Sequence, residues 1–213
     1  MGQKVNPLGF RLGGLYTWDS RGFVAKDKYK KFVLEDLILR KAITEKLRPA
    51  GISKIEIERS INKIDVILHV SRTGIVIGRG GQGLEEIKKF VEGIIFGKIG
   101  KTDSKLKLEI KIEPIKEANL DAYLVAVNVA DQLIKRLPQR RVCSGAVNKV
   151  IAAGAKGVKI ILAGRIGGAE ISRRETYKSG TIPLSTLRED IDFARFAALT
   201  RSGYVGIKVW ICK

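Results

Sequence analysis

The fold of this chain is decided by the stretch Ile75-Val76-Ile77-Gly78-Arg79-Gly80-Gly81, which leads into an amphipathic run predicted to be a helix. Glycines before a helix N-terminus leave backbone N–H groups uncovered, in the positive field of the helix end. This arrangement is typical of phosphate binding. Because the chain has 40 Lys and Arg against 22 Asp and Glu, a net charge of +18, we expect a polyanionic partner. Nucleic acid is the first candidate.

The composition indicates a globular protein. Its 213 residues allow one large or two small domains, and a hydrophobic fraction of 45% is sufficient for packed cores. The only two cysteines, Cys143 and Cys212, are far apart, which indicates a reducing compartment more than a disulfide framework. The N-terminus has no apolar segment, and the most apolar later stretch is interrupted by Lys149, Lys156 and Lys159. We therefore expect neither a secretory signal nor a membrane span.

Periodicity predicts a basic N-terminal arm and a first domain. Residues 1–25 are rich in glycine and basic residues and lack a sustained pattern, so we expect an extended arm with little core of its own. The first domain is expected at residues 26–113. Its order is helix, strand, strand, short helical turn, glycine loop, helix and strand, with the longer elements at residues 27–47, 55–57, 64–70, 82–95 and 106–112.

A polar break around Pro114 separates a second domain. Residues 114–118 are the expected linker and residues 119–213 a C-terminal α+β domain. We expect helices at residues 119–137 and 140–154, then a strand at residues 158–163, a polar hairpin region through residues 171–177, and strands at residues 191–199 and 205–211. The inward face of the first of these helices is predicted to consist of Leu120, Tyr123, Leu124, Val127, Leu133, Ile134 and Leu137. That of the second is predicted to consist of Ala146, Val147, Val150 and Ile151.

The glycine loop also fits nucleotide-binding patterns, but poorly. Gly78, Gly80 and Gly83 match G-x-G-x-x-G, yet the acid at the required distance, Asp103, comes before a strand instead of ending one. A Walker A loop ending at Gly100-Lys101-Thr102 would need its first glycine at Ile95, so that interpretation fails.

The favoured interpretation is the I-G-x-x-G loop of a KH domain, residues 77–81. Such a loop clamps the backbone of about four unpaired nucleotides. The predicted order of elements matches one variant of this fold, and the net charge agrees with it. A glycine-rich turn without a ligand is the simpler alternative, which charge and element order together make less favoured.

The reactive side chains are better explained by structure than by chemistry. His69 is the only histidine and falls within a strand pattern, and neither cysteine has a companion at metal-ligand spacing. Asp190 and Asp192 share a strand face and are expected to form ion pairs in so basic a protein. We therefore expect no catalytic residue, no metal ion and no cofactor.

Basic residues gather at two further places. One group brackets the turn at Pro138, and the other flanks the glycine-rich hairpin region of the second domain. Together with the glycine loop, these two groups predict that the protein contacts RNA at several sites, and they favour this over a merely solubilising charged surface. The candidate RNA-binding residues are Gly78, Arg79, Gly80, Gly81, Lys88, Lys135, Arg136, Arg140, Arg141, Arg165, Arg173, Arg174 and Lys178.

Four segments resemble one known family. They are the opening MGQKVNPLGFRLG, the loop VIGRGGQGLEEI, the block GAKGVKIILAGRIGGAEISRRETYKSGTIPL and the ending GYVGIKVWICK. In this order they resemble the third protein of the small ribosomal subunit, in its bacterial and organellar form, over nearly the whole chain. The resemblance implies a type II KH domain (αββααβ) followed by a C-terminal α+β domain with two helices on a mostly antiparallel sheet.

The resemblance also implies a function. Members of this family are structural constituents of the small-subunit head and bind ribosomal RNA. They also contribute to the tunnel through which mRNA enters, where they grip mRNA and help to unwind it. The implied partners are ribosomal RNA, mRNA and the tenth and fourteenth small-subunit proteins, with no membrane and no small-molecule substrate. The implied location is the ribosome of the cytoplasm, or of the plastid stroma if the chain is organellar.

The family's mRNA-gripping helix presents two adjacent arginines and, a few residues on, a lysine. Arg140 and Arg141 match the pair, whereas Ser144 and Gly145 stand where the later basic residues are expected. Two other functions stay open at this point. A free-standing KH regulator or RNA chaperone would need neither the N-terminal arm nor the second domain, and a nucleotide-dependent enzyme would have to use the weak glycine fingerprint.

Overall fold

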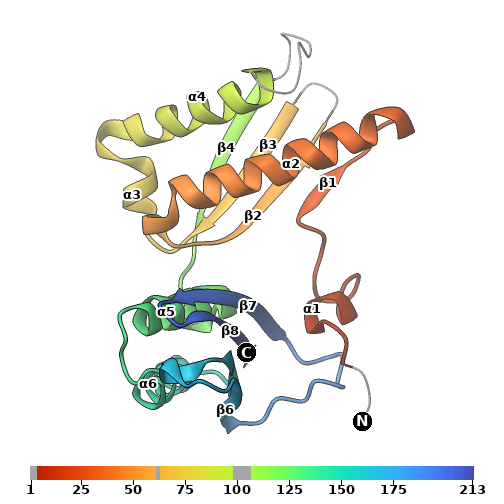
Figure 1. Ribbon diagram of the computed structural model, residues 1–213. Helices are drawn as coiled ribbons and strands as arrows, with labels where there is room; N and C mark the ends of the chain where they lie inside the picture. The colour runs from red at the N-terminus through yellow and green to blue at the C-terminus, as the bar shows by residue number, and fades with distance from the viewer. Residues whose placement is uncertain (1–3, 61–62, 98–106) are drawn as a thin grey trace. The chain divides into compact units, whose positions relative to one another are not determined.

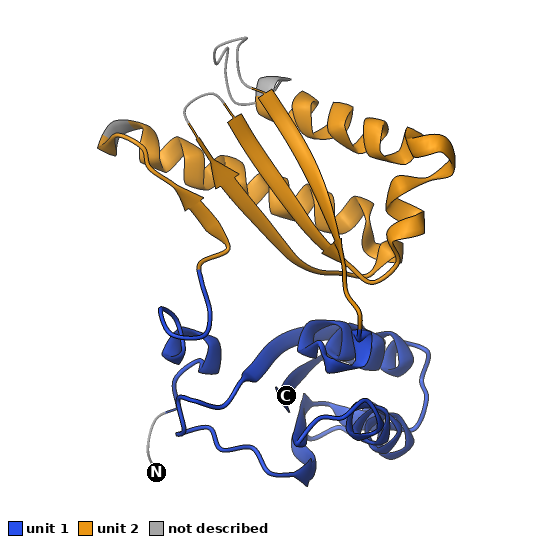
Figure 2. Ribbon diagram, turned by 180° about the vertical axis from the view of Figure 1, so that it is seen from behind, with its two compact units in different colours: residues 1–17, 117–213 blue, residues 18–116 orange. Residues whose placement is uncertain are grey.

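The computed structural model describes residues 4–60, 63–97 and 107–213, which form two compact units (Figure 1, Figure 2). One unit consists of Trp18–Lys116, and the other of Met1–Thr17 with Glu117–Lys213. The two units meet in the sequence within the expected linker. Asp103, the end of the rejected Walker A match and the first residue of the strand expected at 106–112 lie outside the described residues.

The unit of residues 18–116 is a four-stranded sheet in the order β1-β2-β3-β4, with its helices on one face (Figure 1). β2 and β3 are antiparallel, and β1 and β4 run parallel to their neighbours. The elements are β1 (Ser20–Gly22), α2 (Lys26–Lys46), β2 (Ile52–Arg59), β3 (Lys63–Val70), α3 (Thr73–Ile77), α4 (Gln82–Gly97) and β4 (Lys107–Pro114).

Strand alternation builds the core of this unit. Ile57, Val66 and Leu68 are buried on one face of the sheet, where Leu39 of α2 and Val91 of α4 pack against them. The residues that alternate with them on the opposite face are mostly charged, such as Glu56, Glu58 and Asp65. The expected order of elements from the first long helix to the last strand is confirmed.

A buried ionic cluster fixes α2 to the sheet. The guanidinium of Arg59 lies 2.8 Å from the Glu35 carboxylate and 2.6 Å from that of Asp36, and the ring of Phe32 covers it at 4.6 Å. The side chains of Arg59 and Glu35 are 7% and 5% exposed. The same helix leaves Val33 and other apolar side chains partly exposed, because the face turned to the sheet is the one that carries Glu35 and Leu39.

The other unit contains a second four-stranded sheet, in the order β6-β5-β8-β7 and antiparallel throughout. Helices α5 and α6 pack on one of its faces. The elements are α1 (Pro7–Phe10), α5 (Ala122–Ile134), α6 (Gln139–Ala152), β5 (Gly157–Gly164), β6 (Arg173–Gly180), β7 (Ile191–Thr200) and β8 (Gly203–Cys212). The expected α+β class is confirmed for this unit.

The predicted inward face of α5 is only partly right, because Leu120, Tyr123 and Leu133 pack against the core but none of the seven predicted residues is buried. The helix begins at Ala122, where Asp121 accepts the N–H of Leu124 at 2.9 Å, and it ends at Ile134, earlier than expected. Small side chains let α5 lie close to the sheet, so the buried residues are Ala122, Val125, Ala126, Val129 and Ala130. The larger residues counted in the prediction lie at the flanks and the end, where Ile134 and Leu137 are 43% and 45% exposed.

The prediction for α6 was better. Val147 and Val150 are buried as expected, Ala146 and Ile151 are partly buried, and Val142 and Cys143 complete the inward face.

The N-terminal segment is divided between the two units, with Thr17 the last residue in one and Trp18 the first in the other. Arg11 is 2% exposed, and its guanidinium donates to the carbonyl oxygens of Leu184, Thr186 and Glu189 at 2.9–3.1 Å. The hydroxyl of Tyr16 donates to Asp190. These bonds attach residues 7–16 to the second unit, while β1 adds an edge strand to the first.

We predict that Arg59→Leu destabilises the protein by about 3 to 5 kcal/mol, because it leaves two buried or nearly buried carboxylates without a partner. The control is Arg21→Leu, whose ion pair with Glu58 has side chains 47% and 37% exposed, and which should cost less than about 1 kcal/mol. Urea unfolding monitored by circular dichroism measures both. Equal losses would mean that burial of the Arg59 cluster has no special role.

Candidate nucleic-acid interface

The glycine loop of the first unit joins α3 to α4 in a tight crossing. Gly78 has φ +70°, and a Cβ there would lie 3.0 Å from the backbone nitrogen of Gly83. A Cβ on Gly83 would lie 2.6 Å from the carbonyl oxygen of Val76. These two glycines therefore permit the helices to approach, which explains the first and last glycines of the G-x-G-x-x-G match without a dinucleotide.

The middle of the loop presents its backbone to solvent. Gly80 and Gly81 have φ +62° and +84°, and a Cβ on either would meet nothing within 4 Å. The first N–H groups of a helix lack partners inside it, so the start of α4 offers donors to a phosphate here. Arg79 is exposed, and its side chain forms no ion pair with a described residue. Lys88 is exposed further along α4.

Apolar surface adjoins this loop. Ile75 and Ile77 on α3 are 50% and 41% exposed, so the surface beside the phosphate-binding backbone is apolar. KH domains place bases in an apolar groove next to the loop. Sequence reasoning did not select these two residues, although large apolar side chains directly before the glycines were the available signal.

The predicted basic corner lies between α5 and α6. Arg136 adopts φ +62°, the only such value for a non-glycine residue in the described part of the chain. Arg136 and Arg165 line one cavity of about 560 Å³ together with Arg201, which sequence reasoning missed. Arg165 is fixed there, since its Nε donates to the Ala169 carbonyl at 2.9 Å and its Nη1 to that of Ser202 at 3.2 Å.

The remaining residues of this corner are exposed along its surface. Lys135 follows the last residue of α5, and Arg140 and Arg141 lie in the first turn of α6. Ser144 is exposed one turn beyond the arginine pair. The structure thus brings the first predicted basic group together at one corner.

The second predicted basic group is divided by the strand alternation of β6. Arg173 lies 3.1 Å from the carboxylate of Glu175, on the same face of the strand. Arg174 and Lys178 point to the other face of the sheet, which the helices leave open. Arg165 lies in the cavity at the α5–α6 corner, so these four residues do not form one site.

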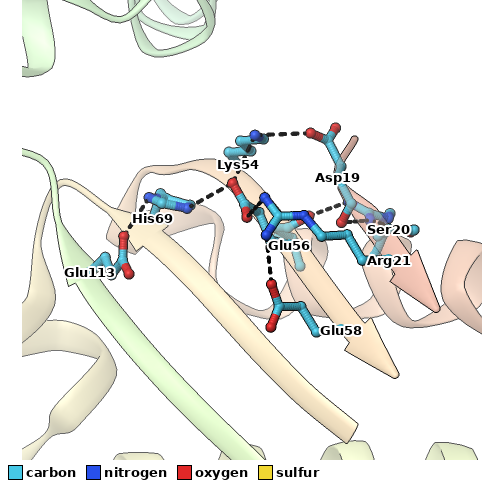
Figure 3. Close-up of polar contacts among 10 residues, drawn as sticks. Asp19, Ser20, Arg21, Lys54, Glu56, Glu58, His69 and Glu113 are labelled. Carbon is cyan, nitrogen blue, oxygen red and sulfur yellow. Dashed lines mark hydrogen bonds and ion pairs between the residues drawn. The ribbon is translucent and has the colours of Figure 1, made fainter. Parts of the chain in front are cut away.

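The helix-free face of the first sheet is also charged, but it carries carboxylates among its cations, and several of these are paired (Figure 3). Lys54 lies 2.8 Å from Glu56 and 3.1 Å from Asp19, and Arg21 lies 2.8 Å from Glu58. Burial acts to raise the pKa of Glu56, but the hydrogen bond and charge of Lys54 outweigh it and lower that pKa below its usual value. This face is therefore close to electrically neutral.

The reactive residues have structural partners. His69 lies between the carboxylates of Glu56 and Glu113, 3.4 Å from each (Figure 3). Burial raises the pKa of the Cys143 thiol to about 12. Asp192 accepts the N–H of Ala122 at 2.9 Å and lies 3.8 Å from Lys213.

Among the described residues, no group of three or more His, Cys, Asp or Glu side chains is placed to hold a metal ion. No helix in the described part of the chain is long and apolar enough to cross a membrane.

Known proteins match both units. A family model described as KH domain matches residues 38–120, and one described as ribosomal protein S3, C-terminal domain, matches residues 129–211. The chain is 48% identical over all 213 residues to small ribosomal subunit protein uS3 of Caldicellulosiruptor saccharolyticus, of which it covers 92%. Proteins of the same name from Desulfatibacillum aliphaticivorans and Spiroplasma citri are 46% and 43% identical, with 93% and 82% covered. The chain belongs to the uS3 family.

Membership of the uS3 family confirms the resemblance and the fold that it implied, a KH domain followed by a C-terminal α+β domain. The KH match contains the glycine loop, with Gly78 and Arg79. The match to the C-terminal uS3 domain contains the α5–α6 corner, with Arg140 and Arg141.

We predict that replacing Arg79 and Gly80 together with Asp weakens binding of single-stranded RNA, because two carboxylates then repel the phosphates. The fold should persist, since both positions are exposed and Asp tolerates a positive φ better than most residues. The matched control is Lys89→Asp with Gly93→Asp, which makes the same charge change at exposed positions of α4. Fluorescence anisotropy with labelled RNA measures affinity, and equal affinity of the loop variant and the control would make the loop purely structural.

Proposed function

We propose that this chain is a structural constituent of the small ribosomal subunit head that binds ribosomal RNA and acts without enzymatic activity. The observation that carries the proposal is the open space beside the backbone of Gly80 and Gly81 at the start of α4, in a chain whose whole length matches proteins named uS3. A net charge of +18 supports it, because release of counterions from RNA favours binding of a basic protein.

Two binding modules are proposed. The KH domain, residues 26–113, holds unpaired nucleotides at the loop, and the C-terminal domain, residues 119–213, presents the α5–α6 corner. Residues 114–118 link them. The proposed protein neighbours are the tenth and fourteenth small-subunit proteins, and the proposed location is the ribosome of a bacterial cytoplasm or of a plastid.

The corner is proposed to face mRNA as it enters the subunit. Arg140 and Arg141 are exposed, while Val142 and Cys143 after them are buried and hold the helix on the sheet. Neither arginine has a partner among the described residues, so both guanidinium groups are available to phosphates. Arg136, Arg165 and Arg201 in the adjacent cavity extend the positive surface.

We predict that Arg140→Ala with Arg141→Ala leaves stability within about 1 kcal/mol, because both side chains are exposed and unpaired. Ribosomes that carry the double variant should assemble but translate a message with a stable hairpin ahead of the ribosome more slowly than an unstructured message. Lys28→Ala with Lys30→Ala, two exposed lysines of α2, is the charge-matched control. Equal slowing on both messages would contradict contact with entering mRNA, and failure to assemble would assign the pair to ribosomal RNA instead.

We predict the opposite effect for Ser144→Lys. The new ammonium group would lie one helical turn beyond the arginine pair on an exposed face, where it adds a phosphate contact. Passage through hairpins should become faster, as timed by single-turnover translation of the two messages. Asn148→Lys, one further turn along α6, is the control for added charge. An unchanged rate for Ser144→Lys would place this face away from the path of mRNA.

A further inference from the structure

The second sheet has a face that α5 and α6 do not cover. Strand alternation and register place its residues in rows across the four strands, three of which carry the groove described below. From β6 to β7 the rows are Lys178, Lys159, Trp210 and Phe193; then Thr176, Ile161, Lys208 and Arg195; then Arg174, Ala163, Gly206 and Ala197. Basic side chains therefore surround the partly buried ring of Phe193, while Trp210, 8% exposed, lies in a small apolar cluster beneath them with Ile161.

This face is hollowed into a continuous groove. Two cavities of about 600 and 490 Å³ lie along it, and they share Ile161, Arg174, Arg195 and Lys208. The larger one is also lined by residues of the N-terminal segment and by the aromatic side chains. Its further lining includes Lys4, Phe10, Lys159, Phe193 and Trp210.

Contacts within the protein itself form the groove. Asn6, Pro7 and Phe10 form one wall, and the carbonyl oxygens that bind the Arg11 guanidinium hold this segment against residues 184–189. On the floor the rings of Phe193 and Trp210 lie 5.1 Å apart, and the ammonium of Lys159 lies 5.5 Å from the Trp210 ring.

The charge of the groove is uncompensated. No acidic residue is among the described residues that line either cavity. The side chains of Arg174, Arg195 and Lys208 form no hydrogen bond or ion pair with any described residue. Burial, together with the positive charges of Lys4, Arg174 and Lys178, lowers the pKa of Lys159.

The first sheet offers an internal comparison. Its open face also carries cations, but carboxylates such as Glu56, Glu58 and Glu109 lie among them, and Lys54, Lys63 and Arg21 are each paired at 2.8–3.4 Å. Unpaired cations repel one another and destabilise a fold, so an anion that neutralises them binds favourably. The two open faces thus differ in the balance of charge, because among the described residues only the first carries carboxylates among its cations.

We propose that this groove, lined by Lys159, Arg174, Arg195 and Lys208, binds a single strand of RNA, as a contact separate from the KH loop and the α6 arginines. The proposal rests on the proposed function in that RNA is the ligand. A basic groove with aromatic side chains is the usual device for unpaired strands, since phosphates meet the cations and bases lie against the rings. A duplex turns its bases inward and would leave the rings of Phe10 and Phe193 without a partner. An acidic protein segment has no bases and would also leave these rings without a partner.

The test uses the full chain with Trp18→Phe, so that Trp210 is its only tryptophan and its emission reports on the groove. The probe is an oligouridylate of about 12 nucleotides, within the usual range of site sizes. Saturable change of Trp210 emission is expected. In the triple variant Lys159→Gln, Arg195→Gln, Lys208→Gln the affinity should fall at least about tenfold, and the slope of log affinity against log salt should fall by about 2.

Two controls make the outcome specific. Lys28→Gln, Lys30→Gln, Lys41→Gln removes the same charge from exposed positions of α2 and should change affinity less than about twofold. Lys159→Arg, Arg195→Lys, Lys208→Arg keeps the charge and should retain binding, which separates loss of charge from loss of fold.

Three results would overturn the proposal. The first is unchanged Trp210 emission while anisotropy still shows RNA binding. The second is an equal loss of RNA affinity in the groove variant and in the α2 control. The third is tighter competition by polyglutamate than by oligouridylate, which would make the ligand an acidic protein segment. Absence of any RNA binding by the parent chain would instead overturn the proposed function.

Discussion

In each unit the long helices lie on only one face of a four-stranded sheet, so the other face must be stabilised or used without a second layer of long helices. The rest of the structure depends on this constraint. The first sheet satisfies it with lateral ion pairs such as Lys54 with Glu56 and Arg21 with Glu58. The second sheet leaves its basic side chains unpaired and partly walls them in with the N-terminal segment.

The high positive charge of the chain therefore has two separate uses. Arg11 and Arg59 are buried and fully engaged with carbonyls or carboxylates, and they hold segments together. Arg79, Arg140 and Arg141 are exposed and have no partner among the described residues, which leaves them to the phosphates of RNA. Burial and partners therefore indicate whether a basic residue holds the fold together or is available to RNA. Its place in a charged run of the sequence indicates this less well.

Local sequence patterns predicted many of the strands, helices and loops of the structure. The alternation around Ile64, Val66 and Leu68 marked a strand and its buried face, and the glycines before α4 marked the loop, because both signals depend on neighbours in sequence. Other features depend on distant packing. The inward face of α5 was predicted only in part, because its close approach to the sheet selects small residues such as Ala126 and Ala130 over the larger ones nearby. The four-strand groove was missed because Lys159, Arg195 and Lys208 meet only through the register of β5, β7 and β8.

The central claim is that unpaired cations make the RNA contact and paired ones do not. Acetylation of lysines, quantified by mass spectrometry on the full chain with and without small-subunit ribosomal RNA, tests it most directly. The account predicts that RNA protects Lys159, Lys178 and Lys208 while Lys54 and Lys63 react as before. Protection of Lys54 and Lys63 together with unchanged reactivity of Lys159, Lys178 and Lys208 would contradict it.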